Sequence, residues 1–221
     1  MARVAEMRAP AEPSSTLQRA KYVRMLEAAA ELGGAKDLDR VQMHELAKLA
    51  GVAIGTLYRY FPSKTHLFVA VMVSKFDQLN AAIPTRQVPS GQPADAIAET
   101  LVRVLHVLMR RPMLATSMIH SVITANVSTV VEVGEVDSQI RRALLVAARL
   151  NEPTEEDLVV IRLVIQQWYG VIQSCLNGHI DIARAESDLR MGCQLLLVHV
   201  SSDTSRHPVN GTGPTSSTEH P

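Results

Sequence analysis

The stretch VQMHELAKLAGVAIGTLYRYFPSK, residues 41–64, decides the fold. Its apolar residues recur at three- and four-residue spacing, which predicts two short helices, over 41–49 and 53–61. Gly51 lies between them and supplies the turn, and Pro62 ends the second helix because its ring excludes the helical conformation from the preceding residue. Neither helix is long enough to be stable alone. The pattern is therefore that of a helix-turn-helix, in which two short helices share one small core.

The two faces of this unit differ in chemistry. Ala47 is small enough to let the helices cross closely, and we expect the inward face to consist of Leu46, Leu49, Val52 and Leu57. The outer face carries hydroxyl, amide, imidazole and cationic groups, on Gln42, His44, Thr56, Tyr58, Arg59, Tyr60 and Lys64. Such groups contact phosphate, and an arginine in a major groove can pair with a guanine edge. Gly55 lacks a side chain, which lets the helix backbone approach DNA.

Helices are also predicted on both sides of this segment. The preceding one covers 17–32, and we expect Gly33 and Gly34 to end it in the left-handed conformation. The following one begins after Ser63, a suitable N-cap, and runs to about Ala82. Its third position is His66, so the Glu that would complete a capping box is missing.

The rest of the chain is predicted to be helical as well, because alternation with period two is hard to find. The segment Pro84–Pro93, with three prolines and a glycine, is the clearest internal boundary. Thr154 caps the longest helix and is followed by three acidic residues, which suit a helix N-terminus. The predicted helices after the boundary are 94–110, one that restarts at Pro112, 138–150, 154–177 and 181–200.

The charge of the chain is balanced only on average. The 221 residues include 22 Lys and Arg against 22 Asp and Glu, a net charge of zero. Residues 1–66 contain 10 basic and 7 acidic side chains, a sum of +3, whereas residues 67–221 contain 12 and 15, a sum of −3. The basic excess therefore accompanies the segment that predicts DNA binding, where phosphate attraction requires it.

The sequence carries no pattern typical of export or of a membrane span. Residues 1–13 lack a continuous apolar region, and the longest uninterrupted apolar run, 67–73, has seven residues against the roughly 20 that cross a bilayer. Cys175 and Cys193 are too few for a disulfide framework or a four-thiolate zinc site, and we interpret them as reduced core thiols. We expect a cytoplasmic protein with no metal site, no cofactor and no membrane partner.

Residues 51–64 resemble the motif of the tetracycline-repressor-like (TetR) transcriptional regulators. The family pattern G-V-x-x-G-T-L-Y-x-x-F-x-x-K is present as Gly51-Val52, 55–58, Phe61 and Lys64, and the resemblance covers about residues 17–80. It implies an all-α fold with an N-terminal three-helix helix-turn-helix DNA-binding domain, 14–66. A larger C-terminal helical ligand-binding and dimerisation domain, 67–200, would follow. A disordered arm, 1–13, and a disordered tail, 201–221, complete the expected organisation.

The resemblance also implies which residues contact operator DNA. Tyr58 has an equal alternative, in which its ring lies partly in the core and only its hydroxyl reaches phosphate. His44 departs from the family, where arginine is frequent, and a neutral imidazole would weaken this contact or make it pH-sensitive. One helix-turn-helix makes few base contacts, so we expect a homodimer with DNA-binding units about 34 to 36 Å apart on a palindrome. The implied contacts are Gln42, His44, Ala53, Gly55, Thr56, Tyr58, Arg59, Tyr60 and Lys64.

The variable half looks like the actinobacterial repressors of sterol and lipid catabolism. This implies a small hydrophobic effector, such as a steroid, a lipid or an acyl-CoA thioester, that shifts the 63–82 helix and releases DNA. Adaptable apolar side chains suited to its pocket, each with the alternative of an ordinary core residue, are Leu105, Met109, Met113, Met118, Val122, Trp168 and Ile172. In the family the last two helices pair with their symmetry mates, which implies dimerisation through Ile165, Ile172, Leu189, Cys193 and Leu196. The alternative is that these stripes only cover the core of one chain.

Three other functions are compatible with parts of the sequence. An enzyme is disfavoured because there is no HExxH, G-x-S-x-G or phosphate-binding glycine loop, although His106 and His120 could meet in the pocket. A thiol redox-responsive regulator would use the two cysteines. A non-DNA helical interaction module would keep the fold and lose the DNA contacts.

Overall fold

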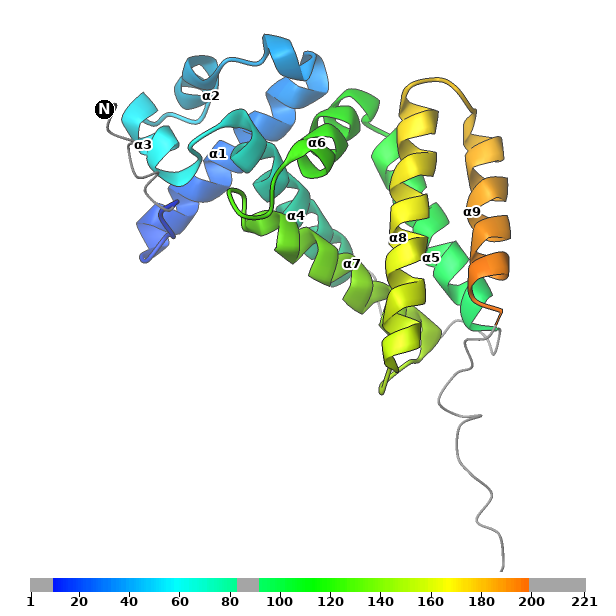
Figure 1. Cartoon of the computed structure of the whole chain (residues 1–221). Coiled ribbons are helices and arrows are strands. Elements are labelled where there is room, and N and C mark those ends of the chain that lie inside the picture. The colour runs from blue at the N-terminus through cyan, green and yellow to red at the C-terminus, as the bar shows by residue number, and fades with distance from the viewer. Residues whose placement is uncertain (1–9, 83–91, 199–221) are drawn as a thin grey trace, which may run out of the picture.

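The structure of the protein is a computed structural model that describes residues 10–82 and 92–198. Over these two ranges the chain is entirely helical, with nine α-helices, one short 3₁₀ helix and no strand (Figure 1). The expected all-α fold is confirmed. The bounds are α1 Thr16–Ala35, η1 Leu38–Arg40, α2 Met43–Leu49, α3 Ile54–Tyr60, α4 Lys64–Ala82, α5 Pro93–Met109, α6 Pro112–Thr124, α7 Glu132–Ala148, α8 Glu155–Leu176 and α9 Ile182–Leu196.

Local signals at the helix ends predict most of these bounds. Gly51 adopts a φ of +63°, as the turn requires, and prolines occupy the first turns of α5 and α6. At the start of α8, Thr154 Oγ1 accepts from Asp157 N at 3.2 Å, and the Asp157 carboxylate accepts from Thr154 N at 2.8 Å. This reciprocal capping box fixes the first turn of the longest helix.

The expected end of the first helix at Gly33 and Gly34 is wrong. Both glycines lie within α1, which continues to Ala35. A Cβ atom at Gly33 would lie 2.5 Å from Cε1 of Phe68, and one at Gly34 would lie 2.5 Å from a guanidinium nitrogen of Arg111. The pair therefore lets α4 and the start of α6 approach α1 closely, and its role is packing rather than left-handed capping.

The start of α7 also differs from the expectation, because Glu132 precedes the predicted Ser138 by six residues. Val136 and Ile140 are buried and extend the apolar stripe of this helix towards its N-terminus. Two acidic residues in its first turn, Glu132 and Glu135, favour a helix N-terminus. The last helix ends at Leu196, and the predicted end at Val200 lies outside the described residues.

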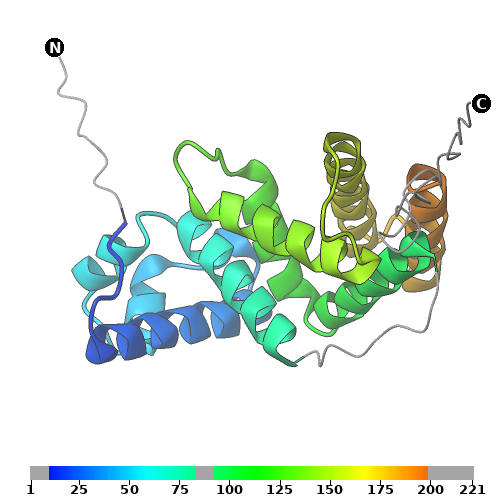
Figure 2. The same ribbon diagram turned by 90° about the horizontal axis from the view of Figure 1, so that it is seen from below.

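The helices form two groups with α4 between them. We call residues 10–63, with α1–α3, the head, and residues 92–198, with α5–α9, the body. Figures 1 and 2 show the head at one side of the molecule and the pair α8 and α9 at the other. One side of α4 packs against α1 of the head, and α6 and α7 of the body pack against the rest of it. Leu67, Phe68 and Met72 of α4 are fully buried, so head and body share one continuous core.

In the body, α8 and α9 lie side by side and both pack against α5 (Figure 1). By length and composition alone, α8 is apolar enough to cross a membrane, with a mean hydropathy of 1.2 over its most apolar window. Core helices pass the same test, and the Ile161, Val164, Trp168 and Ile172 side chains of α8 are buried against neighbouring helices. This single helix is weak support for a membrane span.

Candidate functional site

The helix-turn-helix is closed by a small apolar core. Leu46 and Ala47 of α2 meet Leu57 of α3, and all three are buried. Val52 N donates to Ala47 O at 3.0 Å across the turn, and Val52 is half-buried. These contacts fix the orientation of α3 on α2, as the sequence predicts.

Leu49 does not belong to this core. Its side chain is 46% exposed, so the predicted inward orientation is wrong. The buried stripe of α2 runs through Met43, Leu46, Ala47 and Ala50, at helical spacings of three and four residues. Leu49 lies one residue off this stripe.

The outer surface of α2 and α3 is open, and we call it the recognition face. Tyr58 is 48% exposed and the neighbouring Arg59 is also exposed, so the alternative of a partly buried Tyr58 loses support. A Cβ at Gly55 would meet nothing within 4 Å, which leaves room for a close approach of another molecule. The recognition face comprises Gln42, His44, Ala53, Gly55, Thr56, Tyr58 and Arg59, with Thr56 half-buried and the others exposed.

Tyr60 does not lie on the recognition face, contrary to the expectation. It is 2% exposed, because it follows Leu57 by three residues and so shares the inner side of α3. Its ring packs edge-on against Tyr22 of α1, with centroids 5.8 Å apart. Arg59 donates to the Tyr60 hydroxyl at 3.2 Å and lies 5.1 Å from its ring centroid. Tyr60 therefore packs α3 onto α1, and its hydroxyl and ring hold the Arg59 guanidinium in position.

Lys64 is also engaged within the head. Its Nζ donates to Leu38 O at 2.9 Å and lies 3.4 Å from Asp39 O, and the side chain is half-buried. The predicted DNA contact of Lys64 therefore competes with hydrogen bonds inside the head. The lysine ties the start of α4 to η1, a contact between residues 26 positions apart that has no local sequence signal.

The N-terminal segment makes a contact that the sequence did not indicate. Ala11 N donates to Arg59 O at 3.0 Å, at the C-terminal end of α3, where carbonyl groups lack helical partners. Within the predicted arm, 1–13, this contact holds Ala11 against α3, whereas residues 1–9 lie outside the described part of the chain, as does the predicted tail over 201–221.

The residues expected to line an effector pocket lie mostly in the core of the body. Leu105, Met118, Val122, Trp168 and Ile172 are buried, and Met109 is half-buried. Met113 is exposed and separate from them. It lines a groove of about 350 Å³ between η1, the start of α6 and the end of α8, together with Asp37, Asp39, Ser117, His120 and Leu176.

Some polar atoms in the body are buried without a hydrogen-bond partner among the described residues. They include the indole Nε1 of Trp168, the hydroxyl of Tyr169 and Oγ of Ser121. The Trp168 and Tyr169 rings contact each other, with centroids 5.0 Å apart. Burial, with a smaller effect from Asp137, raises the pKa of Tyr169, so its hydroxyl remains a hydrogen-bond donor. Unpaired buried donors are costly and are usually satisfied by water or a ligand.

The residues expected at a dimer interface face the interior of their own chain. Ile165, Ile172, Leu189 and Cys193 are buried, and Leu196 is half-buried. A partner subunit cannot contact the four buried side chains, so this expectation is corrected in favour of its alternative. A different apolar set is exposed, which we call the α8–α9 face: Val159 and Leu163 of α8, Met191 and Leu195 of α9, and Val198 just beyond the end of α9.

The chain matches two family models over most of its length. The first, described as bacterial regulatory proteins of the tetR family, matches residues 25–71. The second, described as the tetracyclin repressor-like C-terminal domain, matches residues 91–196. The chain belongs to the TetR family. It is a helix-turn-helix transcriptional regulator and not an enzyme.

Relatives with curated names support this TetR assignment. The HTH-type transcriptional repressor KstR of Rhodococcus jostii (strain RHA1) is 30% identical over 195 residues, which cover 88% of this chain and 89% of that protein. KstR of Mycobacterium tuberculosis (strain ATCC 25618 / H37Rv) is 28% identical over 189 residues, 86% of each chain. A TetR transcriptional regulator of known crystal structure from Rhodococcus sp. RHA1 is 57% identical, with a TM-score of 0.80, and covers 85% of this chain and 100% of that one.

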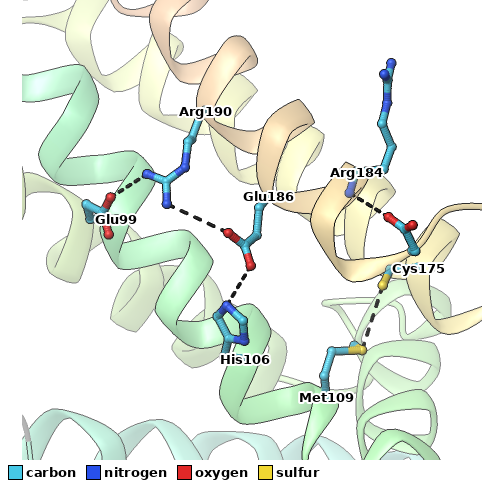
Figure 3. A network of polar contacts seen from close by, with 8 residues as sticks. Glu99, His106, Met109, Cys175, Arg184, Glu186 and Arg190 are labelled. Atoms are coloured by element: carbon cyan, nitrogen blue, oxygen red, sulfur yellow. Dashed lines mark hydrogen bonds and ion pairs between the residues drawn. The ribbon is translucent and has the colours of Figure 1, made fainter.

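The two histidines considered for a TetR pocket do not meet. His106 of α5 lies on the surface, where its Nε2 is 2.8 Å from Glu186 Oε1 of α9 (Figure 3). Arg190 of α9 pairs with Glu99 of α5 in the same network. His120 instead lines the groove beside η1. Both histidines therefore lie outside the body core.

The two cysteines have different surroundings. Cys175 Sγ donates to Met109 Sδ at 3.9 Å, as Figure 3 shows, and Cys193 is fully buried in α9. Burial raises the pKa of Cys193 to about 11, and burial together with Asp181 raises the pKa of Cys175. Because the thiolate is the reactive form, this environment disfavours a thiol redox sensor.

Proposed function

We propose that the protein is a repressor that binds a palindromic operator as a homodimer and is released by a small hydrophobic effector. The observation that carries this proposal is the recognition face, where Arg59, Tyr58 and Gln42 are exposed around the open backbone of Gly55. The one acid of α2, Glu45, is paired with Lys36 at 2.6 Å, so its charge is neutralised beside a surface intended for phosphate. In this proposal the DNA-binding domain is 14–66 and the effector and dimerisation domain is 67–200.

The α8–α9 face supports the dimer. Four large apolar side chains exposed on two adjacent helices, with Val198 just after the second helix, favour burial against a second copy. We expect Leu163→Glu combined with Leu195→Glu to give monomers in sedimentation experiments. Val146→Glu, which changes an equally exposed apolar residue on α7, is the matched control and leaves the dimer intact. A dimer that survives the double substitution would assign the interface elsewhere.

The buried unpaired polar atoms support an effector that enters the body. Trp168 Nε1–H is a donor in an apolar environment and Ser121 can donate or accept, so a largely apolar molecule with a carbonyl or hydroxyl group would complement them. Steroids, lipids and acyl-CoA thioesters combine these features. The KstR relatives, whose names give them as transcriptional repressors, add to the case for repression.

DNA binding is tested with a duplex selected from a random-sequence pool by the purified protein. We expect a palindromic consensus and a band shift at low salt that Arg59→Ala weakens by at least tenfold. Arg142→Ala, which removes an exposed arginine of α7 far along the chain, controls for the loss of one positive charge. If no sequence is enriched and both variants behave like the wild type, the protein is an interaction module and not a repressor.

The effector is tested by thermal-shift screening of hydrophobic metabolites, including a 3-ketosteroid, a fatty acid and a long-chain acyl-CoA. A compound that binds the folded state raises the melting temperature. We expect the active compound also to release the selected duplex. A panel in which every stabilising compound leaves DNA bound would contradict effector-controlled release.

A further inference from the structure

The first turn of α4 connects the recognition helix to both parts of the molecule. It begins four residues after α3 ends at Tyr60. Lys64 of this turn donates to Leu38 O in the head. His66, two residues later, makes a hydrogen bond to Thr129 O in the loop between α6 and α7 of the body, at 3.0 Å and across 63 positions of sequence. One turn of helix therefore holds contacts to head and body at once.

The hydrogen bonds of His66 define its tautomer. The Thr129 carbonyl can only accept, so Nε2 of His66 carries the hydrogen and donates it. Nδ1 then accepts from the Ser63 hydroxyl at 2.8 Å in the neutral imidazole. His66 is 7% exposed, whereas Ser63 is half-buried and Thr129 is exposed, so the two bonds lie at the edge of the core. His66 thus stands where a capping box would have Glu, keeps a bond to the Ser63 cap, and adds a bond to the body that a carboxylate cannot make.

The acceptor for His66 lies in an exposed but hydrogen-bonded turn. Thr129 N and Val130 N both donate to Asn126 O at 2.9 Å, and the Asn126 side chain accepts from Ser128 N at 2.9 Å. Val130 is buried. The loop is therefore a structured turn, and the position of the Thr129 carbonyl is set by the body.

The other end of α6 is tied to the head as well. Arg111, directly before the first residue of α6, donates to Ala30 O of α1 at 2.9 Å. The helix between these two ties contains Met118 and Val122, which belong to the core around Trp168. If a molecule bound in that core displaces α6, the Arg111 contact would move α1 and the His66 contact would move the first turn of α4.

We propose that His66 is a positioning residue for DNA binding: its bond to Thr129 O fixes the first turn of α4 on the body and thereby sets the separation of the two recognition helices in the dimer. This inference rests on the proposed function. Phe61 and Leu67, on either side of this turn, are buried. Because they pack tightly, a shift of His66 relative to the body would also move α3. Loss of this bond leaves the shared core and the Arg111 contact in place but lets the first turn of α4 shift on the body, a movement that we call the pivot.

The pivot predicts a specific readout, the preference of the dimer for one half-site spacing. We would measure Kd for the selected duplex and for duplexes with the spacer lengthened or shortened by one base pair. His66→Glu keeps a partner for the cap and removes the donor to Thr129 O. The spacing ratio is Kd for a duplex with an altered spacer divided by Kd for the selected duplex. We expect His66→Glu to reduce this ratio by about 3- to 10-fold, the effect of one net hydrogen bond. Ser63→Ala removes the cap, keeps the donor, and is expected to lower the melting temperature with the ratio unchanged.

The conservative pair His66→Gln and His66→Asn repeats the comparison if His66→Glu does not fold. The glutamine amide reaches as far as Nε2 and is expected to retain the wild-type spacing ratio, whereas the shorter asparagine amide is not. Equal ratios for these two variants, or a His66→Glu protein with the wild-type ratio, would overturn the role of His66. A wild-type protein that binds no duplex at all would instead overturn the proposed function.

Discussion

The guanidinium of Arg111 donates to the backbone carbonyl of Ala30 at 2.9 Å, which joins the start of α6 to the last turns of α1 across 81 positions of sequence. The bond places a cation near the C-terminal end of α1, where the helix dipole favours positive charge. A Cβ at Gly34 would lie 2.5 Å from the Arg111 guanidinium, so a side chain there would force Arg111 to shift away from this position.

We predict that Arg111→Met lowers the free energy of unfolding by about 1 to 2 kcal/mol, at the lower end of the roughly 1.5 to 3 kcal/mol of a charged hydrogen bond because Arg111 is exposed. Arg110→Met is the matched control, because Arg110 is equally close to the start of α6 and exposed. Urea unfolding at one fixed protein concentration measures both, since dimer formation makes stability depend on concentration. Equal effects of the two substitutions would assign no role to the Ala30 contact.

The neighbouring tyrosines of α3 are predicted to have opposite roles. Tyr58→Ala should weaken binding of the selected duplex with little change in stability, because Tyr58 lies on the recognition face. Tyr60→Ala should lower the stability of the protein by about 3 to 5 kcal/mol, because it removes a buried ring packed on Tyr22. Thermal unfolding and band-shift experiments on both variants separate these effects. A stable Tyr60→Ala protein with a selective loss of DNA binding would contradict the burial of Tyr60.

The two cations nearest the motif should differ in salt dependence. Arg59→Ala is expected to reduce the slope of log Kd against log salt concentration by about one, because a phosphate or base contact releases counterions. Lys64→Ala is expected to lower affinity by a similar factor at every salt concentration, since the Lys64 ammonium binds Leu38 O within the head. Fluorescence titrations of the duplex over a range of salt concentrations compare the slopes. A reduced slope for Lys64→Ala would show that this lysine leaves Leu38 to contact DNA.

The α8–α9 pair has a glycine whose replacement should be destabilising. Gln167 Nε2 donates to Asp188 O at 2.9 Å, and a Cβ at Gly192 would lie 1.8 Å from the same nitrogen. Gly192→Ala therefore displaces the Gln167 amide from its acceptor, and we expect a loss of about 1 to 3 kcal/mol. Gly134→Ala, in α7 with nothing within 4 Å of the added atom, should stabilise by about 0.5 to 1 kcal/mol. Chemical unfolding of both variants gives the comparison, and a stable Gly192→Ala protein would contradict this packing.

Stability should fall in alkaline solution, because Cys193, Cys175, Tyr22 and Tyr169 all have raised pKa values in the folded protein and lose their protons more readily in the unfolded chain. Burial raises the pKa of Cys193 from 9.0 to about 11, so the unfolded chain loses this proton first and stability falls from about pH 9 to pH 11. Burial, with smaller effects from Glu132 and Glu12, raises the pKa of Tyr22 to about 12, which extends the fall above pH 10. Cys193→Ala should reduce the fall between about pH 9 and pH 11 and retain the fall due to the tyrosines, as measured by unfolding in the presence of a reductant. Wild-type stability that is constant between about pH 8 and pH 10.5 would contradict the burial of this thiol.

The parts of the structure that the sequence predicts well depend on short-range chemistry. Gly51, Pro62 and the Thr154–Asp157 box each act within four residues, and the helix bounds around them were predicted closely. The recognition face was predicted because Leu46 and Leu57, both within the motif, are buried and so define the opposite, outer side of α2 and α3.

The parts that it predicts poorly depend on which distant surface a residue meets. Gly33 is a packing contact and not a cap because Phe68 lies against it, and Lys64 is bound because η1 brings Leu38 O within reach. The stripe through Leu189 and Cys193 faces inward because α5 and α8 cover it, and periodicity alone cannot distinguish a covered stripe from a dimer interface. His66 had a local signal, the missing Glu of a capping box, but its partner Thr129 is known only from the fold.

Trp168 makes the body interior observable in an unmodified protein. It is the one tryptophan in the sequence, its ring is 1% exposed, and its indole N–H is unpaired among the described residues. In the free protein its fluorescence emission maximum therefore lies at short wavelength. The maximum shifts to longer wavelength when a bound molecule brings a polar atom to Nε1 or admits water beside it. The protein thus carries its own optical probe at the position where we propose that an effector binds, and no label is needed to follow a titration.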